Sequence, residues 1–127
     1  MVHVAWNDHA AGENDQMYYK RSTNGGATWS GAKRLTWTSN ETDDPCLAID
    51  SNSHIHMVWS GDIFIGSEIY YRKSTDGGVA WSAPRRLTWT SGDSFSPAAA
   101  IDSGNIIHVV WTDRLPGNPE IYYRNGN

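Results

Sequence analysis

The sequence predicts an all-β chain that holds about two and a half copies of one repeated unit, and two observations support this fold class. The first is a period of 52 residues, which brings tyrosine pairs, tryptophan segments and single prolines into register. The second is that the repeating segments are short, rich in β-branched and aromatic residues, and without a helical period. The residues in register include Tyr18-Tyr19, Tyr70-Tyr71 and Tyr122-Tyr123, Leu35 to Thr38 with Leu87 to Thr90, and Pro45 with Pro97.

The second copy is complete and predicts four strands. Turn residues separate its segments, which run over Cys46–Asp50, Ile55–Ser60, Glu68–Lys73 and Trp81–Thr88. Four antiparallel strands in about 50 residues is the size of one β-propeller blade. The predicted fold is therefore a β-propeller of four-stranded antiparallel blades.

Both ends of the chain enter the repeat part-way. The first copy begins at its second strand and the third stops after its third strand, so we expect three, four and three strands in three blades. These blades are expected at residues 1–38, 45–90 and 97–125 of a single segment, 1–127. Three blades are too few to close a propeller ring. Either the chain is a fragment of a longer propeller, or two chains close a six-bladed ring, and we expect the homodimer.

Two glycine turns carry a family resemblance. The segments Ser22–Trp29 and Ser74–Trp81 resemble the Asp-box, Ser-x-Asp-x-Gly-x-Thr-Trp, of the bacterial neuraminidase repeat in sialidase-like β-propellers. Each departs at one position, because Asn24 replaces the aspartate and Ala80 replaces the threonine. The resemblance implies that the box is a structural hairpin between the third and fourth strands and not an active site. Its structural residues here are Ser22, Asn24, Gly26, Trp29, Ser74, Asp76, Gly78 and Trp81.

The composition limits the partners that we expect. The chain has a formal net charge of −4, whereas nucleic acids and anionic membranes select a concentrated basic surface. We therefore expect neither nucleic acid nor a membrane as a partner. The chain as given has no segment suited to span a membrane and no signal-peptide pattern, which leaves the localisation undetermined. With Cys46 as its single cysteine it forms no intramolecular disulfide, and we expect no cofactor.

The repeat also separates residues that hold the fold from residues that are needed once. His3, His56 and His108 recur in every copy, and equivalent positions on sheets stacked about 10 Å apart are too distant for one metal ion. Glu68 with Tyr70 has the composition of a sialidase nucleophile pair, but this pair recurs as well. The resemblance implies three substrate-binding arginines and an Arg-Ile-Pro segment in a sialidase, and neither is recognisable here. We therefore nominate no metal ligand and no catalytic residue.

Unrepeated residues gather in loops that we expect on one face of the blades, at 7–16, 39–44, 60–67, 91–96 and 112–119. Variable loops on a rigid scaffold commonly bind ligands. Phe64 stands out because it lies in an apolar run within an otherwise polar loop. Trp37 and Trp89 could stack on a sugar, but they repeat, and we expect them at the edge of the core. The predicted ligand-binding residues are Asp43, Asp44, Phe64, Asp93, Phe95, Asp113 and Arg114.

These observations favour a non-catalytic, sialidase-like propeller module that binds carbohydrate or another ligand on the face with the variable loops. The choice of a glycan follows from the fold resemblance alone. Two alternatives stay open. One is a glycoside hydrolase whose active site is assembled across the homodimer, and the other is a purely structural propeller fragment.

Overall fold

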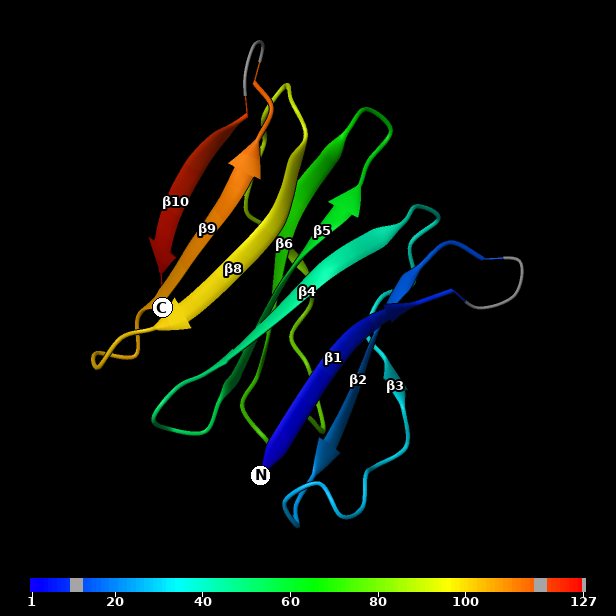
Figure 1. Cartoon of the computed structure of the whole chain (residues 1–127), viewed down its shortest axis with the longest axis vertical. Helices are drawn as coiled ribbons and strands as arrows, with labels where there is room; N and C mark the ends of the chain where they lie inside the picture. Colours follow the sequence, from blue (N-terminus) through cyan, green and yellow to red (C-terminus); the bar gives the residue numbers. More distant parts are fainter. Residues whose placement is uncertain (10–12, 116–118, 127) are drawn as a thin grey trace.

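The computed structural model describes residues 1–9, 13–115 and 119–126, and in this part of the chain the strands form three antiparallel sheets (Figure 1). The all-β fold and the predicted strand numbers of three, four and three are confirmed. No helix in the described ranges is both long and apolar enough to cross a membrane. The first sheet has β1 (Val2–Asp8), β2 (Gln16–Ser22) and β3 (Lys33–Arg34); the second has β4 (Thr42–Ile49), β5 (Ile55–Asp62), β6 (Ser67–Ser74) and β7 (Arg85–Arg86); the third has β8 (Ser94–Ile101), β9 (Ile107–Asp113) and β10 (Glu120–Gly126).

The second sheet is packed between the other two. β4 lies between β1 and β8 and contacts both (Figure 1). Successive residues of a strand point to opposite faces, and on β5 both faces are buried. Met57 and Trp59 pack in one apolar cluster with residues of the first sheet, whereas Val58 packs in a second cluster with Val109 and Trp111 of the third. Successive residues of β5 therefore belong to the two apolar clusters in turn.

The predicted strand bounds need correction at the outer edge. We expected a strand over Trp81–Thr88, but the strand that pairs with β6 is limited to Arg85 and Arg86. On either side of it, the amides of Ser82 and Leu87 still donate to β6 carbonyls, at 2.8 and 2.7 Å. Pro84 has no backbone N–H to donate, which limits pairing before Arg85. After Arg86, the hydroxyl of Thr88 accepts a hydrogen bond from the Ile69 amide at 2.9 Å, in place of a backbone carbonyl. A side chain thus ends the strand.

At the inner edge, β4 begins at Thr42, four residues earlier than expected, because the strand contains a β-bulge. The register shifts between Asp43 and Cys46, and Asp44 has a positive φ of 53°. Pro45 follows Asp44. A bulge tolerates proline because the bulged residues are unpaired, so no ladder hydrogen bond is lost with the missing proline N–H. The same bulge recurs in β8, where Ser96 has a φ of 51° before Pro97.

The Asp-box turns are held by their own side chains. In the second turn, the Ser74 hydroxyl donates to Asp76 at 2.8 Å and accepts from the Gly78 amide at 2.8 Å, and Asp76 accepts from the Ala80 amide at 2.9 Å. The hydrogen bonds that Asp76 accepts lower its pKa, and the bond from the Ala80 amide has the largest effect, followed by that from the Ser74 hydroxyl. The first turn has the matching bonds of Ser22 with Asn24 and Gly26 and of Asn24 with Thr28.

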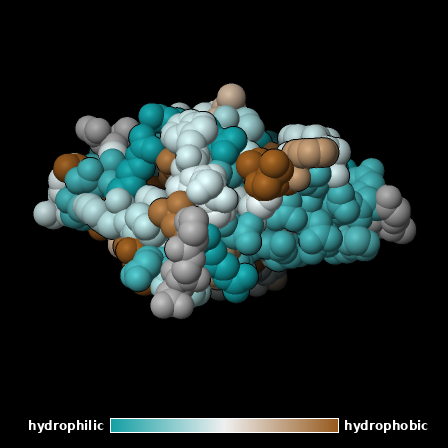
Figure 2. Space-filling view, turned by 90° about the horizontal axis from the view of Figure 1, so that it is seen from above, coloured by the Kyte–Doolittle hydropathy of each residue, from teal (hydrophilic) through white to brown (hydrophobic). Residues whose placement is uncertain are grey.

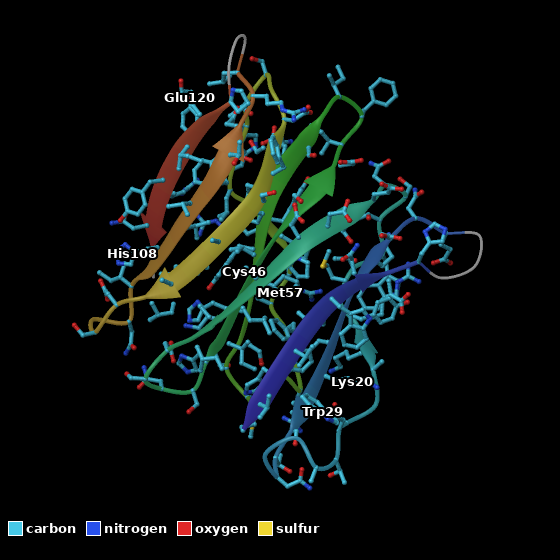
Figure 3. All side chains as sticks on the ribbon, in the orientation of Figure 1. Lys20, Trp29, Cys46, Met57, His108 and Glu120 are labelled. Carbon is cyan, nitrogen blue, oxygen red and sulfur yellow. The ribbon has the colours of Figure 1, made fainter. Side chains whose placement is uncertain are left out.

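The second turn also contacts the first sheet. A Cβ atom at Gly78 would lie 2.1 Å from the Tyr19 hydroxyl, so only glycine allows this approach. Trp81 meets the Tyr19 ring edge-on, with 5.2 Å between the centroids. Trp29, its counterpart in the first turn, stays 42% exposed beside Lys20 on the outer face of the first sheet (Figure 3).

The repeated histidines hydrogen-bond within their own sheets. His56 Nδ1 is 2.9 Å from the Tyr71 hydroxyl and its Nε2 is 3.2 Å from Asp50. His108 has the same two partners, Tyr123 and Asp102, in the third sheet. Within the described ranges, no group of three or more His, Cys, Asp or Glu residues is arranged to hold a metal ion.

Candidate ligand-binding hollow

The loops that join β5 to β6 and β7 to β8 gather at the upper end of the sheets in Figure 1. Figure 2 looks down on this end and shows a mostly hydrophilic surface with isolated apolar groups. The predicted loops at 7–16 and 112–119 lie partly outside the described residues.

An open hollow of about 400 Å³ lies here between the second and third sheets. Three of the seven predicted ligand-binding residues, Asp93, Phe95 and Arg114, line it together. Sequence reasoning did not nominate the other lining residues, although they belong to the Phe64 loop and its flanks. These are Asp62, Ile63, Gly66 and Ser67.

Two glycines allow the loops around the hollow to approach each other. The Arg114 amide donates to the Asp93 carbonyl at 2.9 Å, which joins the β7–β8 loop to the end of β9. A Cβ atom at Gly92 would lie 2.0 Å from the Arg114 carbonyl oxygen. At Gly66, which has a φ of +85°, it would lie 2.6 Å from an Asp93 carboxylate oxygen. At Gly92 the loops therefore meet by a backbone approach that a larger residue would prevent, whereas Gly66 is needed for its positive φ.

The side chains of the hollow combine an aromatic ring, a cation and carboxylates. The guanidinium carbon of Arg114 lies 4.9 Å from the centroid of the Phe95 ring, within the range of a cation–π interaction. The hydroxyl of Ser67 donates to the Asp62 carboxylate at 3.0 Å. Asp93 adds a second carboxylate to the lining. The hollow thus offers directed donors and acceptors beside one apolar ring.

The other predicted residues occupy different places. Asp44 accepts from the amide and the hydroxyl of Ser96, at 3.2 and 3.1 Å, and so joins the bulges of β4 and β8. Asp113 is fully buried and accepts from the Ser94 hydroxyl at 2.8 Å, so its carboxylate belongs to the packing of β8 on β9. Phe64 is fully exposed and does not line the hollow.

Asp43 lies in a second polar cluster, at the upper end of the first sheet. The Asn7 amide donates to Asp43 and to Asp15, both at 2.9 Å, and His9 Nδ1 lies 2.8 Å from Asp15. Burial raises the pKa of Asp43, and the negative charges of Asp15 and Glu41 raise it further. The sequence places Asn7 and His9 in a variable loop of this face, but they were not selected as ligand-binding residues, because only the pairing of β1 with β2 brings them near Asp15.

Glu68 is committed to a structural ion pair. It is fully buried, accepts from Arg86 at 2.6 Å and from the Thr90 amide at 3.2 Å, and also binds the Thr88 hydroxyl. Its donors occupy the carboxylate on several sides, which leaves it poorly placed to attack a substrate.

Sequence comparisons assign no family to this chain: no family model matches it, and no curated protein matches it. Comparison with solved structures shows similarity of fold. A crystal structure of a protein of unknown function from Dyadobacter fermentans matches with a TM-score of 0.71 and 12% identity over 97% of this chain and 34% of the other. An endo-arabinase from Bacteroides thetaiotaomicron matches with a TM-score of 0.64 and 15% identity over 95% of this chain and 50% of the other.

The chain therefore spans a third to a half of the length of these two proteins. At such low identity the likeness establishes the fold: an all-β arrangement that matches part of a larger protein, in one case a glycosidase.

Proposed function

We propose that the three sheets are blades of a β-propeller and that the chain is a non-catalytic module that binds carbohydrate in the hollow of Asp62, Asp93, Phe95 and Arg114. The observation that carries the proposal is the convergence of these four side chains from two sheets on one open hollow. Concave sites with a few placed polar groups beside apolar surface are the usual form of a small-molecule site.

The chemistry of the hollow suits a polyhydroxylated ring. Carboxylates accept hydrogen bonds from neighbouring hydroxyls, and a guanidinium donates to ring and hydroxyl oxygens. The ring of Phe95 provides an apolar surface for C–H groups. Two carboxylates against one guanidinium leave a formal charge of −1, which disfavours an acidic sugar and favours a neutral one. The fold likeness to an endo-arabinase supports carbohydrate as the ligand class.

A glycan array that includes neutral and acidic oligosaccharides tests this proposal. We expect binding to neutral glycans, lost in Phe95→Ala and kept in Phe64→Ala. Phe64 is the matched control because it is a phenylalanine of the same face that lies outside the hollow. Binding that follows Phe64 and not Phe95, or an array with no neutral glycan bound, contradicts the proposal.

A second candidate, a glycoside hydrolase, is favoured by one observation. The carboxylates of Asp43 and Asp15 are bridged by the Asn7 side-chain amide at 2.9 Å each, and burial together with the charge of Asp15 raises the pKa of Asp43, as expected of a general acid. A panel of aryl glycosides that includes an arabinofuranoside tests it. Turnover that survives purification and disappears in Asp43→Asn would replace the binding proposal by this one.

We also propose that the outer faces of the first and third sheets meet in a homodimer that closes a six-bladed ring. Large side chains are exposed there: Val4 and Trp29 on the first sheet and Ile121 and Tyr123 on the third. Exposed apolar side chains on the outer faces of two sheets favour an interface between them. The mass in solution, described below, tests the dimer independently of any ligand.

A further inference from the structure

A second recess lies between the first and second sheets, apart from the hollow described above. It has a volume of about 320 Å³, and its lining includes the rings of Trp37, Trp59 and Tyr70. Trp59 and Tyr70 lie nearly parallel, 5.8 Å apart at the ring centroids. Trp37 is 70% exposed, in contrast to the core-edge position expected from the sequence. We call this recess the aromatic cleft.

One glycine keeps the aromatic cleft open. A Cβ atom at Gly61 would lie 3.2 Å from two carbons of the Tyr70 ring and 3.6 Å from Trp59 Nε1, so any side chain there would project between the two rings. Gly61 lies inside β5, where glycine weakens a strand. A glycine at such a position often marks a site where another group approaches closely.

The third sheet has the same pair of stacked rings, but a larger residue stands beside them. Trp111 and Tyr122 stack there as Trp59 and Tyr70 do, with centroids 6.1 Å apart. The residue equivalent to Gly61 is Asp113, which is fully buried. One of its carboxylate oxygens has no hydrogen-bond partner in the described part of the chain. The glycine beside the stacked rings is therefore a feature of the second sheet that the third sheet does not share.

Most polar groups around the aromatic cleft already have partners. The Arg72 guanidinium donates to the carbonyls of Ser82 and Leu35. The Thr42 hydroxyl donates to the Asp15 carbonyl at 3.0 Å. A ligand would therefore meet mainly ring surfaces.

Charge around the aromatic cleft is balanced. Asp62 and Arg72 both line it, one of each sign. The guanidinium of Arg34 lies 5.9 Å from the centroid of the Trp37 ring and is itself paired with the Glu13 carboxylate at 2.8 Å. A cation would meet Arg72 and an anion would meet Asp62, so a neutral ligand is favoured.

From this geometry we infer that the aromatic cleft is a second binding site, which takes one neutral sugar ring with its C–H face against Trp37. The choice of a sugar over another neutral ring rests on the proposed carbohydrate function. The cleft and the hollow are lined by different residues apart from Asp62, so the two sites can be tested separately.

Titration of neutral oligosaccharides, followed by tryptophan fluorescence and by calorimetry, tests the inference. We expect Trp37→Ala to weaken binding at this site about tenfold or more, as truncation of an aromatic residue that the bound ligand covers does. Trp89→Ala is the matched control. Trp89 is 66% exposed and lies beneath the Arg86 guanidinium, as Trp37 lies beneath that of Arg34, but Asp113 occupies the position equivalent to Gly61. The Trp89→Ala variant should bind the saccharide as tightly as the wild type does.

Gly61→Asp provides a second, independent variant, since it copies the residue that fills this position in the third sheet. It should abolish the same binding event. Unchanged binding in Trp37→Ala, equal losses in Trp37→Ala and Trp89→Ala, or binding of indole with no binding of any saccharide would each overturn the inference. Binding that is lost only in Phe95→Ala overturns the aromatic cleft and leaves the hollow. Binding that is lost only in Trp37→Ala overturns the hollow as the carbohydrate site and leaves the cleft.

Discussion

Removal of the buried carboxylate of Glu68 tests how the outer edge of the second sheet is held. Glu68→Ala leaves Arg86, Thr88 and Thr90 without their shared acceptor. Breaking a buried ion pair from one side costs about 3–5 kcal/mol. Because the Arg86 side chain is 29% exposed, water replaces part of the lost interaction, and we expect about 3 kcal/mol.

Glu68→Gln should cost much less, because the first sheet has glutamine at the equivalent position. Gln16 accepts from the Thr38 amide at 3.1 Å and donates to the Thr38 carbonyl at 3.1 Å. Glutamine at position 68 thus keeps neutral hydrogen bonds but loses the stronger ones to a charged carboxylate. We expect Glu68→Gln to lower the free energy of unfolding by about 1 kcal/mol.

Urea unfolding followed by tryptophan fluorescence measures both free energies of unfolding. Glu120→Ala is the matched control, since it removes the same residue type from an exposed position at the upper end of β10 (Figure 3). It should change stability by no more than about 0.5 kcal/mol. Equal losses for the alanine and glutamine variants of Glu68, or an alanine loss no larger than that of the control, would refute this reasoning.

Three further predictions concern the loops, acid stability and assembly. Gly92→Ala places a Cβ atom 2.0 Å from the Arg114 carbonyl oxygen. It should therefore lower the free energy of unfolding in urea by about 1–3 kcal/mol and weaken ligand binding at the hollow. An unchanged free energy of unfolding together with unchanged binding would contradict the loop geometry. Burial opposes the ionisation of Asp50, but hydrogen bonds from the His54 amide and from the rings of His56 and His54 lower its pKa from 3.8 to about 2. The folded state therefore gains stability from this group above the unfolded pKa and loses it as the pH falls through about 2. An acid titration of stability in which Asp50→Asn has the same pH dependence as the wild type would exclude this role. Light scattering should give twice the 14.1 kDa of one chain, and a monodisperse monomer would rule out the homodimer.

Much of the fold could be predicted because the same side chains hold every copy. A histidine that binds a tyrosine on the next strand, as His56 binds Tyr71, has to recur wherever that strand pair recurs. The strand bounds were less accessible. The length of β7 depends on whether the Thr88 hydroxyl or a backbone group satisfies the Ile69 amide, and strand propensity carries no information on that choice.

The candidate site could be predicted in part. Asp93, Phe95 and Arg114 were found because they are unrepeated and belong to loops of one face. Asp44 has the same sequence properties, but its carboxylate binds Ser96 across two sheets, a contact that only the packing of β4 on β8 creates. Sequence patterns locate the loops and do not tell which acidic side chain is already hydrogen-bonded within the fold.

The central claim is that the hollow beside Phe95 and Arg114 binds a neutral carbohydrate. Isothermal titration calorimetry of the strongest array ligand, with wild type and Arg114→Ala, tests it most directly. Hydrogen bonds to a charged group contribute about 1.5–3 kcal/mol, so the variant should bind about 10–100-fold more weakly. An unchanged dissociation constant in Arg114→Ala would contradict the claim.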